Sequence, residues 1–328
     1  MTQIPVEAPA SQEALAPQET QTSNQPGPRY ASPVDTTTHG EYRVRQTPGD
    51  PRPLYRFTGR ITADGSSGFA AEAGRYHLYA GWFCPWAQRV TLQHALNGLQ
   101  QVISVSYVDN ARDGRGWAFR EPHGPDPVNG FTLLRQAYEA TEPGFDGHVS
   151  VPVLWDRVGR RIVSNTFGDI SLDLATAFEP WAAGGTDTYP VALRPAIDAL
   201  DARLLVAVNQ GVGAAAGTGP AADAARTLLH ATFAELDERL RTSRYLHGDT
   251  VTESDVRLWV TLVRFDVADN ADGAVGPRRL TDYPTLWAYA RDLYQQPPFG
   301  DSTDFGTFAR LGAALPDWDA PHGRGPAA

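Results

Sequence analysis

The sequence predicts a two-domain protein in which an α/β domain precedes an all-helical domain. Three observations support this fold class. With 328 residues, the chain has room for about two domains of ordinary size. Between residues 75 and 178, short β-rich runs alternate with helical patterns, as they do in α/β sheets. Beyond Tyr189, apolar residues recur only at helical spacing, as in a helical bundle.

Composition sets the expected boundaries of these domains. Residues 1–50 are rich in Pro, Gln, Thr, Ser and Glu, and such a segment cannot bury enough apolar surface to offset its ordering entropy. We therefore expect a disordered tail there. The α/β domain is expected over 51–182, with a Gly-, Pro- and Asp-rich insertion at about 109–148. The helical domain is expected over 183–315, followed by a second tail over 316–328.

The elements of the α/β domain follow the order strand, helix, strand, insertion, hairpin, helix. β-branched and aromatic runs predict the strands, and Gly159 lies at the turn of the hairpin. Pro85 begins a helical pattern that Asn97-Gly98 ends. This order fits a thioredoxin-like sheet, although alternation alone fits several α/β folds. The expected strands are 75–80, 102–108, 151–155 and 161–163, and the expected helices are 85–96, 133–140 and 167–178.

The second half contains four helical patterns. Thr252 starts the third helix, because its side chain can cap the helix while Asp255, three residues on, reaches back as in a capping box. Val251 and Val256 stand where a hydrophobic staple needs them. The other expected helices are 193–208, 228–240 and 284–294.

Charge and cysteine usage exclude several classes of protein. The formal net charge of -10 argues against a general nucleic-acid binder, which needs a concentrated basic surface. No apolar run approaches the ~20 residues that cross a membrane, and no signal-peptide pattern begins the chain. The single cysteine excludes an internal disulfide framework. We therefore expect a cytoplasmic protein with neither a nucleic-acid nor a membrane partner.

Cys84 is the candidate nucleophile. It lies between a predicted strand and a helix whose first residue is Pro85, a residue that suits this position because its missing N–H would be unpaired there. Free N–H groups and the helix dipole favour an anion at the preceding position. We therefore expect an accessible thiol with a lowered pKa. The alternative is that a lone cysteine is a small core residue.

Pro152 is the second candidate feature, because a proline that enters a strand is unusual unless the strand is an edge or the bond is cis. A cis Val151–Pro152 bond would expose the Val151 backbone to a peptide-like ligand, which could pair with it as an added strand. The alternative is an ordinary trans proline at a sheet edge.

Taken together, these motifs resemble those of the glutathionyl-hydroquinone reductases, the Xi class of the glutathione transferases. The similar segments occur in the family's order over about residues 55–300. They are 74–79, 84–87 with Arg89, 151–156, 244–246, 252–258, 264–266, 282–284 and 293–295.

The resemblance implies a thioredoxin-like domain followed by the all-α glutathione-transferase C-terminal domain. It also implies a homodimer that needs a low-molecular-weight thiol and no metal. Cys84 would attack the sulfur of a glutathionyl-quinol, release the hydroquinone and hold a mixed disulfide that a second thiol resolves. The resemblance also predicts a cis Val151–Pro152 bond with Pro152 close to Cys84. Val151 would pair with the bound thiol peptide and Trp86 would pack on it, the alternative for Trp86 being core packing.

The chain departs from the family where the γ-glutamyl end of glutathione binds. The family usually has Glu-Ser there, whereas this chain has Thr166 and Phe167, with Asn165 and Asp169 as the remaining polar candidates. A zwitterionic γ-glutamyl group needs charged or hydrogen-bonding partners, and a phenyl ring supplies none. We therefore expect weak glutathione binding, and another thiol such as mycothiol, which lacks a γ-glutamyl group, becomes a candidate.

The family's substrate tyrosines are also missing, in the stretches 210–213, 267–270 and 305–315. Our first hypothesis is a Cys84-dependent oxidoreductase that acts on thiol adducts of quinones or similar electrophiles. A conventional transferase that conjugates a thiol to an electrophile is the second hypothesis. A non-catalytic binding module that keeps the fold is the third.

Overall fold

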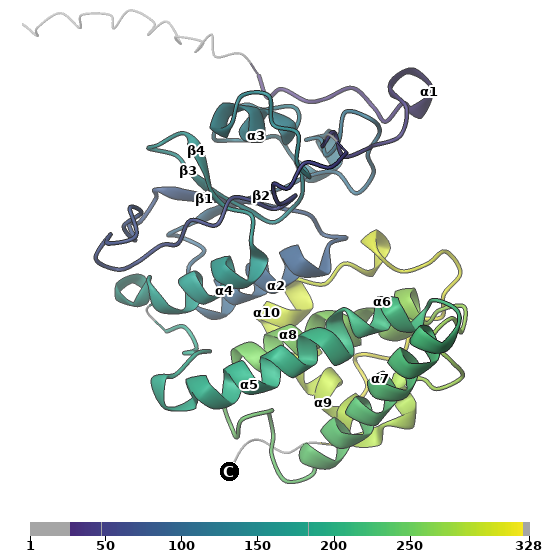
Figure 1. Cartoon of the computed structure of the whole chain (residues 1–328). Helices are drawn as coiled ribbons and strands as arrows, with labels where there is room; N and C mark the ends of the chain where they lie inside the picture. Colours follow the sequence, from purple (N-terminus) through teal and green to yellow (C-terminus); the bar gives the residue numbers. More distant parts are fainter. Residues whose placement is uncertain (1–26, 47, 183, 324–328) are drawn as a thin grey trace, which may run out of the picture.

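The computed structural model describes residues 27–46, 48–182 and 184–323. Figure 1 shows a small sheet between α3 (Arg135–Thr141) on one face and α2 (Pro85–Leu96) with α4 (Phe167–Thr176) on the other. The remaining long helices lie beyond α2 and α4, on the side away from the sheet. The predicted order of an α/β unit followed by helices is therefore confirmed.

The sheet has four strands in the order β2-β1-β3-β4. β1 runs parallel to β2 and antiparallel to β3, and β3 pairs antiparallel with β4. This mixed arrangement is the predicted thioredoxin-like one, with α2 as the crossover between the two parallel strands. The strands are β1 (Tyr76–Ala80), β2 (Ser104–Tyr107), β3 (Val153–Asp156) and β4 (Arg161–Ser164).

Both faces of the sheet are buried. Successive side chains point to opposite sides of a strand, so each strand contributes residues to both cores. Leu78 packs with Val90 of α2 and Ile170 of α4. Its neighbour Tyr79 packs with Tyr138 of α3 on the other face. The insertion thus supplies the second layer that the sheet requires.

The helical region begins with α5 and follows the predicted apolar patterns. Thr252 and Asp255 form the predicted capping box at the start of α8. α7 begins earlier than Leu228, because its first two turns are Ala-rich and mostly exposed and so carry little apolar periodicity. The elements are α5 (Arg194–Leu204), a π-helical turn (Leu205–Asn209), α6 (Gly211–Ala215), α7 (Pro220–Arg239), α8 (Glu253–Arg264), a π-helical turn (Phe265–Asp269), α9 (Pro284–Tyr294) and α10 (Pro297–Asp301).

α2 joins the two regions. Leu92 and Leu96 belong to the same core cluster as Leu258 and Trp259 of α8. Below them, Arg89 of α2 is buried and pairs with the buried Glu253 at the start of α8. The helix that begins next to Cys84 is therefore fixed on both sides, by the sheet and by the helical core.

The prediction of a disordered N-terminal tail is wrong for the described residues from 27 onward. Ala31 N–H donates to the Phe119 carbonyl at 3.0 Å, and Asp35 N–H donates to the buried Asp113 carboxylate at 3.0 Å. A short helix, α1 (Thr36–His39), follows. The composition argument counts apolar burial only, whereas this segment is held mainly by polar contacts with the insertion. Residues 1–26 of the expected tail lie outside the described residues.

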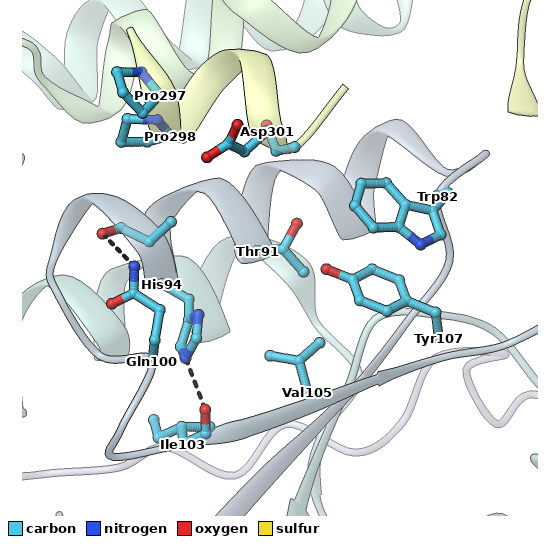
Figure 2. Close-up of a pocket in the computed structure, with 12 residues that line it drawn as sticks. Trp82, Thr91, His94, Gln100, Ile103, Val105, Tyr107, Pro297, Pro298 and Asp301 are labelled. Atoms are coloured by element: carbon cyan, nitrogen blue, oxygen red, sulfur yellow. Dashed lines mark hydrogen bonds between the residues drawn. The ribbon is translucent and has the colours of Figure 1, made fainter. Parts of the chain in front are cut away.

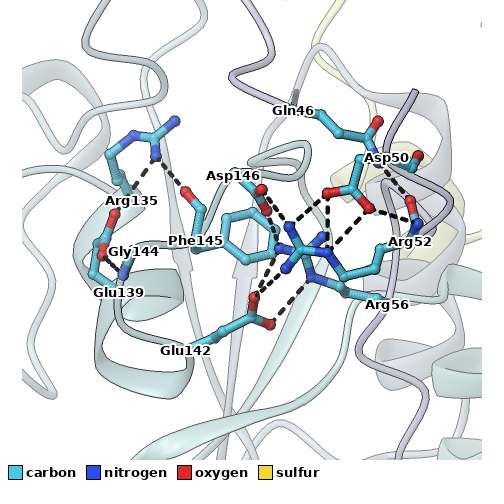
Figure 3. A network of polar contacts seen from close by, with 10 residues as sticks. All are labelled: Gln46, Asp50, Arg52, Arg56, Arg135, Glu139, Glu142, Gly144, Phe145 and Asp146. Carbon is cyan, nitrogen blue, oxygen red and sulfur yellow. Dashed lines mark hydrogen bonds and ion pairs between the residues drawn. The ribbon is translucent and has the colours of Figure 1, made fainter. Parts of the chain in front are cut away.

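Two arginines tie the next part of the segment to the insertion (Figure 3). Arg56 donates to Glu142 at 2.8 and 3.1 Å and also pairs with Asp146, while its guanidinium lies 4.6 Å from the Phe145 ring centre. Arg52 pairs with Asp146 from the more exposed side. This network holds the chain on either side of residues 53–55 against the insertion.

The expected C-terminal tail is also ordered over 316–323. Trp318 is only 5% exposed and packs edge-on against Trp259 and Trp287, with ring centres 5.6 and 4.8 Å apart. A single indole buries enough apolar surface to anchor a short segment, which a composition average over that segment hides. Residues 324–328 lie outside the described range. Within the part of the chain that the structure describes, no helix is long and apolar enough to span a membrane.

Candidate active site

Cys84 stands at the N-cap of α2, as predicted, directly before Pro85. Its carbonyl accepts the first helical hydrogen bond, from Gln88 N–H at 2.9 Å. The side chain is 8% exposed and packs in the core cluster on the α3 side of the sheet. Its thiol donates to the Val151 carbonyl, with the sulfur 3.6 Å from the oxygen. The sulfur is thus both a core atom and part of the site.

The expectation of an accessible thiol with a lowered pKa is wrong for this structure. Burial raises the pKa of the Cys84 thiol, although the backbone N–H groups of Ala87 and Trp86 and the nearby charge of Arg264 act in the opposite direction. The helix-end effect is therefore present, but desolvation outweighs it. Burial also lowers the pKa of Arg264 to about 10.

The Val151–Pro152 peptide bond is cis, as predicted, and both residues line the same cavity as Cys84. The Val151 N–H donates to no other residue within the described part of the chain. The neighbouring Ser150 N–H is occupied, because it donates to the Tyr138 hydroxyl at 3.1 Å. Val151 therefore keeps the backbone donor that an added peptide strand would use.

The cavity beside Cys84 has a volume of about 470 Å³ and brings together the site residues predicted from the sequence, Cys84, Trp86, Val151, Pro152, Asn165, Thr166 and Phe167. The further polar candidate Asp169 does not line it, and its carboxylate lies 3.5 Å from the Arg60 guanidinium. Gln210, which follows the first π-helical turn, brings the helical region to this cavity. The lining residues are Tyr55, Phe83, Cys84, Trp86, Arg112, Trp117, His148, Ser150, Val151, Pro152, Asn165, Thr166, Phe167 and Gln210.

One end of the cavity is formed where α2 and α4 begin. Thr166 is the N-cap of α4, and Phe167 is its first residue. The Phe167 ring stacks on the Trp86 indole, with centres 4.5 Å apart. Asn165 is 3% exposed, and its amide contacts Phe57 N–H at 3.3 Å and the Tyr138 hydroxyl at 3.4 Å. This end therefore offers an aromatic surface and few free polar groups.

A second group of lining residues carries a cation, and no pattern in the sequence indicates it. The Arg112 guanidinium lies 4.3 Å from the Trp117 ring centre and 4.2 Å from that of Tyr42. His148 and Tyr55 complete this group, with their rings edge to face at 5.5 Å. Burial raises the pKa of Tyr55 and lowers that of His148. These residues come from the insertion and the N-terminal segment, where no periodic signal points to a site.

A second cavity, of about 480 Å³, lies between α2, β2 and α10 (Figure 2). Trp82 and Tyr107 stack there with ring centres 4.5 Å apart, and a ring nitrogen of His94 is 2.8 Å from the Ile103 carbonyl. The cavity holds no cysteine, and its histidine is engaged with the backbone. It lacks the nucleophile that the first cavity has.

Among the described residues, no group of three or more His, Cys, Asp or Glu side chains could hold a metal ion. The polar groups at the first cavity are instead one thiol, one guanidinium, one imidazole, one phenol and amide or hydroxyl groups. Such a set suits thiol exchange and ligand binding.

Comparison with known proteins places this site in a family. The model of the glutathione S-transferase C-terminal domain matches residues 219–292. The glutathionyl-hydroquinone reductase PcpF of Sphingobium chlorophenolicum is 42% identical over 224 residues, 67% of this chain and 72% of that protein. The glutathionyl-hydroquinone reductase YqjG of Escherichia coli is 37% identical over 278 residues, 80% of this chain and 84% of that protein.

Solved structures agree with these matches. The glutathione-bound structure of YqjG superposes with a TM-score of 0.77 at 35% identity, covering 82% of this chain and 96% of that one. A glutathione transferase from Gordonia bronchialis gives 0.75 at 38% identity, covering 81% and 89%. With its thioredoxin-like sheet, its helical C-terminal region and these relatives, the chain belongs to the glutathionyl-hydroquinone reductases, a family of glutathione-transferase-like enzymes.

Proposed function

We propose that this enzyme reduces thiol adducts of hydroquinones, with Cys84 as the nucleophile. The observation that carries the proposal is the cavity in which the Cys84 thiol meets the Val151 backbone beside Pro152. A thiol peptide that pairs with the free Val151 N–H would lie along the wall of the cavity that Cys84 lines. The names of the relatives PcpF and YqjG support the same reaction.

The reaction balances with one external thiol. The Cys84 thiolate attacks the sulfur that joins the bound thiol to the quinol ring. The bond between that sulfur and the ring carbon breaks, the carbon takes a proton, and the hydroquinone leaves. Cys84 keeps the thiol as a mixed disulfide. A second thiolate attacks the sulfur of the bound thiol, frees Cys84 and leaves as a disulfide, so that two thiols supply the two electrons.

The second thiol comes from solution, because Cys84 is the chain's one cysteine. Burial of Cys84 disfavours its thiolate form. The charge of Arg264 and the N–H groups at the start of α2 favour the thiolate. Glutathione is the first co-substrate to test, since the similar YqjG structure has glutathione bound. Mycothiol is the second, because of Thr166 and Phe167. A homodimer and a cytoplasmic location also remain proposals, which sedimentation and cell fractionation test.

The test is turnover of S-glutathionyl-hydroquinone with excess thiol, followed by the release of hydroquinone. Cys84→Ala removes turnover under this proposal, and intact mass spectrometry of the natural protein shows one added thiol that is absent from Cys84→Ala. Full turnover in Cys84→Ala overturns the mechanism. Conjugation of glutathione to 1-chloro-2,4-dinitrobenzene that does not need Cys84 favours the transferase hypothesis, and binding without any turnover favours the binding module.

A further inference from the structure

Arg112 occupies an unusual position in the Cys84 cavity. Its guanidinium lies over two aromatic rings, 4.3 Å from the centre of Trp117 and 4.2 Å from that of Tyr42. The Trp117 ring in turn stacks on Phe83, with centres 4.3 Å apart. The N–H donors of a guanidinium lie in its plane, so rings packed over the group leave these donors for a partner at its edge. A planar fork of donors held in this way matches a carboxylate.

Arg112 has no anionic partner within the described part of the chain. Its neighbours on the same segment do: Arg115 donates to Asp113 at 2.7 Å, and Arg120 donates to Asp109 at 2.8 Å. Burial lowers the pKa of Arg112, and the titratable groups beside it are the phenols of Tyr42 and Tyr55, which are neutral at ordinary pH, rather than a carboxylate. A half-buried cation without a counter-ion in a ligand cavity is expected to receive its anion from the ligand.

The lining residues Trp86, Thr166 and Phe167 offer no such charge. A guanidinium near them, that of Arg89, is 1% exposed, lies 5.3 Å from the Phe167 ring and pairs with Glu253. The cavity therefore combines an aromatic surface at Phe167 with a cation at Arg112 that has no ion-pair partner among the described residues. A bound molecule with one anionic arm has one favourable direction along the Val151 backbone.

We propose that Arg112 is the specificity residue for the thiol co-substrate and selects a thiol with a carboxylate near its cysteinyl group. This inference rests on the proposed function. In glutathione the matching group is the glycyl carboxylate, which is one residue from the cysteinyl sulfur. A neutral sugar thiol such as mycothiol has no group for Arg112, so the structure favours the carboxylate-bearing class even though Phe167 weakens the γ-glutamyl contact.

The experiment compares S-glutathionyl-hydroquinone with its glycyl monomethyl ester, which differs only in the charge at the carboxyl group. For the natural protein, the KM of the ester is expected to be about ten- to a hundredfold higher, the range for a lost charge-assisted hydrogen bond. Arg112→Met, which keeps a long unbranched side chain beside the two rings, should raise the KM of the acid by a similar factor and leave that of the ester nearly unchanged. Arg112→Lys should fall between the two.

Arg43→Met is the matched control, because it removes the same charge from an exposed residue next to Tyr42. It should leave both KM values unchanged. Equal KM values for acid and ester in the natural protein overturn the inference. This comparison uses only the natural protein, so it does not depend on whether a variant folds. A KM that rises equally for acid and ester in Arg112→Met also overturns it, since Arg112 would then contact the quinol. If Cys84 turns over neither substrate, the proposed function fails instead.

Discussion

The Phe167 ring stacks on the Trp86 indole at a centre distance of 4.5 Å and an interplanar angle of 26°. The stack joins the first turn of α2 to the first turn of α4, two helix ends that both face the Cys84 cavity. Phe167 stands where the family usually has the serine of its Glu-Ser pair. The position that would hydrogen-bond a γ-glutamyl group is thus used for aromatic packing.

The first prediction concerns this pair. Thr166→Glu with Phe167→Ser should lower the KM for S-glutathionyl-hydroquinone by about tenfold or more, because it restores hydrogen bonds to the zwitterionic end of glutathione. A carboxylate at the N-cap of α4 is also favoured by the helix dipole. Phe167→Leu, which loses the stack without adding a polar group, is the control and should not lower KM. A natural protein that already has a low-micromolar KM would show that the γ-glutamyl contact lies elsewhere.

The second prediction concerns the ionisation of Cys84. Because burial raises the pKa of the thiol, the rate of alkylation by iodoacetamide should rise with pH through a midpoint above the ~8.5 of a free cysteine. Arg264→Met removes the cation that favours the thiolate and should move the midpoint higher still. A midpoint below that of a free cysteine would mean that the helix end outweighs burial. Circular dichroism of Arg264→Met checks that the variant is folded.

The features predicted correctly from the sequence are those that depend on local sequence patterns. The strands, Pro85 at the start of α2 and the capping box of Thr252 and Asp255 each depend on residues within a few positions of one another. The position of Cys84 at the N-cap of α2 follows from them, because Cys84 directly precedes Pro85. Such local patterns can be recognised from the sequence without knowledge of the tertiary structure.

The features missed depend on contacts between distant segments. Arg112 reaches the site because the insertion folds back over the sheet and Tyr42 covers the guanidinium, an arrangement with no period in the sequence. The prediction of a lowered pKa for Cys84 failed for the same reason, because distant segments bury the side chain: its thiol lies against the carbonyl of Val151, and both residues belong to one core cluster. Composition also failed for Trp318, where one side chain decides the order of a segment.

The third prediction uses the buried charges between α2, α5 and α8. Asp201 is 6% exposed, and burial together with the nearby Glu253 raises its pKa to about 9, although Arg257, whose Nε lies 3.2 Å from the carboxyl oxygen, acts in the opposite direction. We therefore expect Asp201 to be protonated at neutral pH. A protonated aspartate resembles asparagine, and Asp201→Asn should therefore change the free energy of unfolding little at pH 7. Glu253→Gln should cost about 3–5 kcal/mol, because it leaves the buried charge of Arg89 unpaired. Urea unfolding measures both.

The sign of the pH dependence follows from the same shift. A carboxyl whose pKa is raised by folding contributes stability below its unfolded value, and this contribution is lost as the pH rises towards the folded value of about 9. The natural protein should therefore lose unfolding free energy between pH 7 and pH 9 more steeply than Asp201→Asn. Parallel curves for the two proteins, or an equal cost of the two substitutions at pH 7, would contradict the assignment of the proton to Asp201.

The last prediction tests whether the N-terminal segment is part of the folded protein. The Tyr42 hydroxyl accepts a hydrogen bond from Val149 N–H at 3.0 Å and contacts His148 Nδ1 at 3.3 Å. Val149 is fully buried, so Tyr42→Phe leaves its N–H without a partner and should cost about 1–3 kcal/mol. Tyr189→Phe is the matched control, because its hydroxyl donates to Asp198 at the surface, and it should cost about 0.5 kcal/mol or less. Equal unfolding free energies for Tyr42→Phe and the natural protein would mean that the segment does not pack on the insertion in solution, and Arg112 would then lack one of the two rings that hold it.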